Sequence, residues 1–129
     1  MAVDISYNGP EKREFIRIDY CKPLAYKVCK AETLSKLLEG YTVNVSEAGL
    51  LCNIKKAVNL QDILWLSFDR NVLVACEEIE RRSLIYQSGI IGKVVRINGL
   101  DNGTFDVGVR FLTREEKNAP GVDNLVENE

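Results

Sequence analysis

Regular alternation of apolar and polar side chains over residues 104–112 restricts the fold more than any other sequence feature. This run follows a strand-like run at residues 89–97, and it has apolar side chains at every other position, at Phe105, Val107, Val109 and Phe111. Since successive side chains of a β-strand point to opposite faces, this run predicts a strand with one face on a core. The connection contains Asn102-Gly103, which accepts the positive φ angles of a hairpin turn, so we expect a β-hairpin.

Shorter runs in the first half of the chain predict further strands. Residues 22–30 place Leu24, Tyr26 and Val28 on one side, as a half-buried strand requires. Residues 31–39 fit either a short amphipathic helical turn or an extension of that strand, and their pattern leaves both open.

Two strands joined by a tight corner are expected over residues 42–54, with Val43 and Val45 pointing inward. The run 62–68 is almost continuously apolar and rich in β-forming residues, which predicts a strand that is buried on both faces or whose second face is covered by another element. We expect Trp65 in this run to anchor the core.

Five or six short strands at roughly ten-residue spacings indicate an all-β fold, a small antiparallel β-barrel. Residues 69–88 mix apolar and charged runs, so a strand with a loop and a short helix both stay open there. Farther on, Thr113 and Glu116 have the spacing of a capping box, which predicts a brief helix. The 129 residues suit one domain, which we divide into a flexible arm (1–12), the barrel (13–118) and an acidic tail (119–129).

The composition weighs against several classes of protein. Seventeen basic against nineteen acidic residues leave a formal net charge of −2, unlike general nucleic-acid-binding proteins. Histidine is absent, which removes the commonest general base and zinc ligand and disfavours an enzyme. No apolar run has the length of a membrane span or signal peptide, so we expect a cytoplasmic protein. The cysteines lack CxxC spacing, so we expect reduced thiols and no metal site: Cys21, Cys29, Cys52 and Cys76.

Two arginines four positions apart, Arg13 and Arg17, form the first candidate binding element. On their own they are typical of an ordinary solvated charge cluster. The planar guanidinium group also donates paired hydrogen bonds to a phosphate or to the O6/N7 edge of guanine. The pair therefore predicts a site for an anion, and a guanine nucleotide offers both targets.

The second candidate element is the strand corner from Asn44 to Gly49. Asn, Ser and Gly are common in turns for structural reasons alone. In a binding site, Asn44 would hydrogen-bond a base edge, Ser46 would donate to a phosphate, and Gly49 would let a planar ring approach the backbone.

Together the two elements resemble the cyclic di-GMP-binding signature of the PilZ domain family, RxxxR followed by [D/N]xSxxG. Here the motifs are Arg13–Arg17 and Asn44–Gly49, with 26 residues between them. Residues 92–96 and 105–111 resemble the last two strands of that family. The resemblance implies a six-stranded β-barrel with a C-terminal helix, which is short in this chain because Pro120-Gly121 interrupts it.

The resemblance also implies a bacterial second-messenger receptor that has no catalytic activity and needs no cofactor. Its ligand would be cyclic di-GMP. Arg13 and Arg17 would contact phosphate and guanine, Asn44 a guanine, and Ser46 and Gly49 the neighbouring phosphate and ring. Binding would order the N-terminal arm and create a surface for a downstream protein partner.

Two alternatives stay open. A PilZ-like adaptor would contact proteins irrespective of nucleotide, although the intact signature argues against it. A barrel that binds nucleic-acid polymers is disfavoured by the balanced charge.

Overall fold

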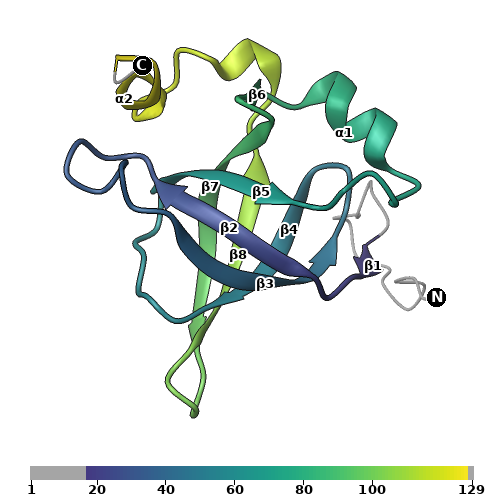
Figure 1. Ribbon diagram of the computed structural model, residues 1–129, viewed down its shortest axis with the longest axis vertical. Helices are drawn as coiled ribbons and strands as arrows, with labels where there is room; N and C mark the ends of the chain where they lie inside the picture. Colours follow the sequence, from purple (N-terminus) through teal and green to yellow (C-terminus); the bar gives the residue numbers. More distant parts are fainter. Residues whose placement is uncertain (1–16, 128–129) are drawn as a thin grey trace, which may run out of the picture.

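The computed structural model describes residues 17–127, and at its centre is a closed β-barrel (Figure 1). Six strands of the described chain form the ring, each antiparallel to its neighbours, in the order β3-β2-β5-β7-β8-β4. Pairing of β3 with β4 closes it. The strands are β2 (Pro23–Val28), β3 (Leu38–Val45), β4 (Gly49–Ile54), β5 (Ile63–Phe68), β7 (Gly89–Gly99) and β8 (Phe105–Phe111). The predicted six-stranded antiparallel barrel is confirmed.

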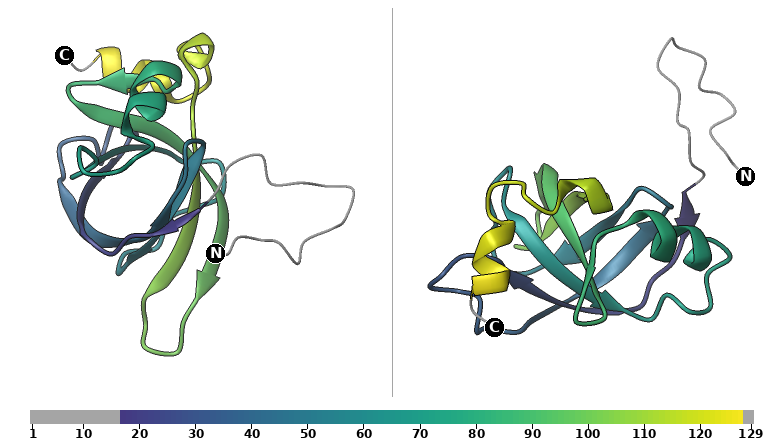
Figure 2. Two further views of the ribbon diagram at one scale, coloured as in Figure 1. Left: turned by 90° about the vertical axis from the view of Figure 1, so that its right-hand side faces the viewer. Right: turned by 90° about the horizontal axis from the view of Figure 1, so that it is seen from above.

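Shorter elements surround the barrel. β1 (Ile18–Asp19) pairs with β3, and β6 (Ile85–Tyr86) pairs with β7. The helices of the described chain are α1 (Cys76–Arg82), the 3-10 helix η1 (Arg114–Glu116) and α2 (Val122–Glu127). Figures 1 and 2 show them at one end of the barrel, with the tip of the β7–β8 hairpin at the other. Over residues 17–127 no helix combines the length and the hydrophobicity of a membrane span.

The sequence left open whether residues 69–88 and residues 31–39 contain a helix or a strand. Residues 69–88 contain a helix, α1, followed by the short strand β6. Residues 31–35 form hydrogen-bonded turns, in which the Leu34 N–H donates to the Lys30 carbonyl at 2.9 Å, before β3 begins at Leu38.

The barrel interior holds the main core, where Leu66 of β5 and Ile90 of β7 are fully buried. Removing a side chain of this size from water contributes roughly 1.5–3 kcal/mol. The predicted hairpin is confirmed, and Gly103 in its turn has a left-handed φ of 88°. The alternating face of β8 lies on the core as predicted, through Val107, Val109 and Phe111.

A smaller apolar cluster lies outside the barrel, where α2 covers β5 and β7. Val122 and Leu125 of α2 pack there with Ile63 and Ile91. Leu64 belongs to the interior cluster, and Ile63 on the outer face is covered by α2, which confirms the second alternative, a strand whose other face is covered by another element.

The expectation that Trp65 anchors the core is wrong. Alternation along β5 sends Leu64 and Leu66 inward and leaves Trp65 on the outer face, half-buried beside the smaller cluster. Its indole N–H donates to the Tyr86 carbonyl at 2.7 Å. An apolar run without polar interruptions does not reveal which of its two faces is the inner one.

The expectation that Val43 points inward is also wrong. The pairing of β3 with β4 shifts between Thr42 and Asn44, and such a bulge changes the face of the side chains around it. Thr42 is therefore fully buried, whereas the side chain of Val43 is exposed. The Thr42 hydroxyl accepts the Lys22 N–H at 2.9 Å and donates to the Tyr20 carbonyl.

Replacing Thr42 by valine keeps the shape of the side chain but removes this hydroxyl, so the Lys22 N–H loses its acceptor. We expect Thr42→Val to lower the free energy of unfolding by about 1–3 kcal/mol, the cost of an unsatisfied buried polar group. Urea denaturation measures the change. Thr42→Ser, which keeps the hydroxyl, is the control and should lose less. A valine variant as stable as the parent would show that the hydroxyl has no structural role.

Candidate ligand-binding site

Arg17, the described residue of the first motif, meets the second motif on the outside of the barrel, beside β1 and the β3–β4 corner. Arg17 immediately precedes β1, and its Nη1 donates to the Asn44 Oδ1 at 2.8 Å. Arg17, Ser46 and Gly49 line one pocket with a volume of about 310 Å³. The structure thus brings four of the predicted site residues together, while Arg13 lies outside the described residues.

The corner between β3 and β4 is held by hydrogen bonds of Ser46. Its N–H donates to the Gly49 carbonyl at 2.8 Å, and its Oγ accepts the Ala48 N–H at 3.2 Å. The hydroxyl also donates to the Gly49 carbonyl at 3.3 Å, and the residue is only 4% exposed. Ser46 therefore shapes the corner, and a contact between its side chain and a ligand stays a prediction.

Gly49 is required by the spacing of two strands. A Cβ at this position would lie 2.2 Å from the Val109 carbonyl oxygen, because β4 and β8 approach closely where Gly49 pairs with Arg110. The corner is tied to β8 a second time by the Phe111 N–H, which donates to the Ala48 carbonyl at 2.8 Å. Gly49 and Val109, which meet at this close approach, both line the pocket.

β7 and β8 also line the pocket, through Val95, Arg96, Gly108 and Arg110. Neither Arg96 nor Arg110 belongs to the predicted motifs. The alternation of β8 puts Arg110 on the outer face, so its position could be predicted from the sequence. The position of Arg96 could not, since a register shift between Val94 and Arg96 interrupts the alternation of β7.

Arg110 already has a carboxylate partner. Its Nη1 and Nη2 each donate to one oxygen of Glu116 at 3.0 Å, and the Thr113 N–H donates to the same carboxylate at 2.8 Å. These hydrogen bonds lower the pKa of Glu116 to about 2, and the largest contribution comes from Arg110. The predicted capping box of Thr113 and Glu116 is confirmed.

Among the described residues, the charge of the pocket comes from three guanidinium groups, those of Arg17, Arg96 and Arg110. Within residues 17–127 no carboxylate forms an ion pair with Arg96. Gly108 lies beside Arg96 and carries no side chain of its own into the pocket. Such a surface suits a ligand that combines phosphate groups with flat rings.

Because Gly49 is needed for strand spacing, Gly49→Ala should lower the free energy of unfolding without any ligand. We expect a loss of about 1–3 kcal/mol, as for other overpacked positions, in thermal or urea unfolding. Gly99→Ala in β7 is the control, because a Cβ there would have no neighbour closer than 3.8 Å. Equal stabilities of the two variants would contradict the close approach of β4 and β8.

Glu116→Gln should lower stability by about 1 kcal/mol at pH 7, since the ion pair with Arg110 is partly exposed and screened by water. The folded pKa of Glu116, about 2, lies below its ordinary value of 4.5, so its contribution is present above pH 4.5 and is lost as the pH falls toward 2. The stabilities of parent and variant should therefore converge over this range in urea denaturation. A difference that is independent of pH would rule out the ion pair as its cause.

Comparisons with known proteins agree with this architecture. The PilZ domain family matches residues 11–127. The structure of the Bacillus subtilis inhibitor of motility (MotI/DgrA) is similar with a TM-score of 0.55 at 10% identity, over 99% of this chain and 56% of that chain. The PilZ domain of YcgR from Escherichia coli, solved with c-di-GMP, is similar with a TM-score of 0.52 at 12% identity, over 91% of this chain and 87% of that chain. No curated protein matches the sequence. The likeness to solved structures shows the shared fold, and with a family match over nearly its whole length, the chain belongs to the PilZ domain family.

Proposed function

We propose that the chain is a receptor for cyclic di-GMP and binds it in the pocket between the β3–β4 corner and the outer face of β7 and β8. The observation that carries the proposal is the convergence of the two motifs, with Arg17, Ser46 and Gly49 on one pocket and Asn44 hydrogen-bonded to Arg17. Membership of the PilZ family supports it, as does the PilZ domain of YcgR, whose structure contains c-di-GMP.

The chemistry of the ligand fits the lining of the pocket. Cyclic di-GMP has two phosphates and two guanine rings, and a guanidinium group donates two parallel hydrogen bonds to either. Arg17, hydrogen-bonded to Asn44, and Arg96 both line the pocket and offer these donors. Arg110 is held by Glu116, so a phosphate there would compete with a carboxylate. Gly108 leaves room for a flat ring beside Arg96.

The remaining signature residues complete the site. Arg13 acts with Arg17 on phosphate and on the guanine edge, and Asn44 contacts a guanine. Ser46 and Gly49 keep the corner in the shape that receives the neighbouring phosphate and ring. A ligand that engages Arg13 and Arg17 together orders the N-terminal arm against the corner. The ordered arm forms a new surface, and a downstream protein partner binds to it.

The proposal makes the protein a receptor without a catalytic step. The ionisable side chains that line the pocket, among the described residues, are those of the three arginines. A guanidinium group stays protonated at all physiological pH values, so it binds anions but cannot act as a general base.

Calorimetric titration with cyclic di-GMP tests this function and gives affinity and stoichiometry together. We expect Arg17→Ala and Arg96→Ala each to weaken binding by at least about 1.5 kcal/mol, because each removes a charge-assisted contact. Lys56→Ala removes an exposed cation that does not line the pocket, so this variant should bind cyclic di-GMP with the affinity of the parent. Parent affinity in the Arg17→Ala variant would overturn the site, and the absence of binding by the parent would favour an adaptor that acts without nucleotide.

A further inference from the structure

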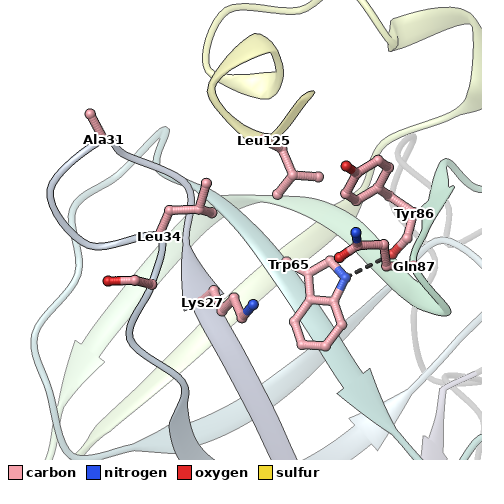
Figure 3. Close-up of a pocket in the computed structure, with 8 residues that line it drawn as sticks. Lys27, Ala31, Leu34, Trp65, Tyr86, Gln87 and Leu125 are labelled. Carbon is pink, nitrogen blue, oxygen red and sulfur yellow. Dashed lines mark hydrogen bonds between the residues drawn. The ribbon is translucent and has the colours of Figure 1, made fainter. Parts of the chain in front are cut away.

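A second pocket, of about 250 Å³, lies on the outer face of β2 and β5. Figure 3 shows Leu125 of α2 and Leu34 from the turn after β2 facing the same space as Trp65, with Lys27 next to the indole. In the order of strands around the ring, the pair β2–β5 lies opposite the pair β8–β4. This pocket is therefore on the other side of the barrel from the proposed cyclic di-GMP site.

The aromatic wall of this pocket is held rigidly. The Trp65 indole N–H donates to the Tyr86 carbonyl at 2.7 Å, as the dashed line in Figure 3 marks. Behind the ring lies the backbone of Gly89, where a Cβ would be 2.3 Å from the indole. An aromatic side chain that is fixed before binding loses little conformational entropy when a partner covers it.

The turn from β6 to β7 is strained where it borders the pocket. Gln87 and Ser88 have φ angles of 50° and 67°, a left-handed conformation that residues with side chains rarely adopt. Asn-Gly would form the same kind of turn with less strain. The turn nonetheless places a glutamine, Gln87, in the pocket lining, and strain of this kind is concentrated at functional sites.

The lining combines four apolar side chains and three polar ones with one positive charge; the apolar ones are Ala31, Leu34, Trp65 and Leu125, and the polar ones Ser35, Tyr86 and Gln87. Lys27 is the one charged side chain among the described residues that line the pocket, and its Nζ lies 5.2 Å from the centroid of the Trp65 ring. Within residues 17–127 no carboxylate forms an ion pair with it. A ligand that carries an apolar group next to a carboxylate would complement the apolar side chains and the ammonium group of Lys27 in this pocket.

The pocket is small enough for a single large side chain to be its occupant. Its volume of about 250 Å³ lies just below the range of about 300–1,000 Å³ that is usual for complete small-molecule ligands. Protein interfaces, in contrast, concentrate their binding energy in a few bulky anchor side chains that fill pockets of the partner surface.

We propose that this pocket docks a partner protein through one aromatic or large aliphatic side chain that is flanked by acidic residues. The anchor packs on Trp65 between Leu34 and Leu125, and a neighbouring carboxylate pairs with Lys27. This surface goes beyond the proposed nucleotide binding and does not depend on it.

Trp65 is the only tryptophan of the chain, so its fluorescence reports on occupation of the pocket. The probes are acetylated and amidated peptides Gly-Ser-Glu-X-Glu-Ser-Gly, with X as Phe, Leu or Ala, and the same peptides with Lys in place of Glu. We expect a saturating change with half-saturation at or below about 1 mM for the Glu peptides with Phe or Leu. The Ala peptide and the Lys peptides should bind at least roughly tenfold more weakly.

A matched variant separates the charge from the packing. Lys27→Met keeps an unbranched side chain against the indole but removes the cation, so it should lose the preference for Glu over Lys peptides while its thermal unfolding stays that of the parent. A Lys27→Met variant that retains the preference would overturn the role of Lys27. The absence of saturable binding by every peptide would overturn the site. Phenylpropionate that binds as tightly as the Phe peptide would identify a pocket for small carboxylates and contradict docking of a protein.

Discussion

The close approach of β4 to β8 at Gly49 is the constraint on which both the fold and the candidate site depend. With no side chain at this position, the two backbones come within a distance that a Cβ would not allow. β4 can then pair with β8 on one side and with β3 on the other, which closes the ring of six strands. The same contact brings the corner of Ser46 and Ala48 next to the arginines of β7 and β8.

Irregularities in the strands determine which side chains reach the candidate site. The shift between Thr42 and Asn44 turns a hydroxyl into the barrel and leaves Asn44 where Arg17 can bind it. The register shift between Val94 and Arg96 likewise interrupts the alternation of β7, and Arg96 lines the pocket. In a barrel made only of regular strands, side chains would alternate strictly between the core and the solvent. Bulges interrupt this alternation and can turn additional polar side chains toward one site.

The outer surface of the barrel is used on two opposite sides. One side carries a pocket with three arginines, suited to an anionic ligand, and the other carries a half-apolar pocket around Trp65. The apolar cluster under α2 joins the second pocket to the C-terminal helix through Leu125. The two pockets lie on different strands of the barrel, so the proposed nucleotide binding and the proposed protein docking would not compete for the same surface.

The class of fold, the hairpin of β7 and β8 and the motif residues at the candidate site could be predicted from the sequence. These features depend on local signals, namely alternation, a turn dipeptide and two short motifs, which are visible in one stretch of chain at a time. The motif residues were predicted as a group, and Arg17, Asn44, Ser46 and Gly49 do lie together.

Tertiary structure alone decided the features that depend on how strands pair. The inward position of Thr42 and the outward one of Val43 follow from a register shift that involves β4, and the outer position of Trp65 follows from which face of β5 closes the barrel. Arg96 joined the site because β7 bulges against β8. Such shifts depend on pairing between distant segments, which the order of residues within one strand does not encode.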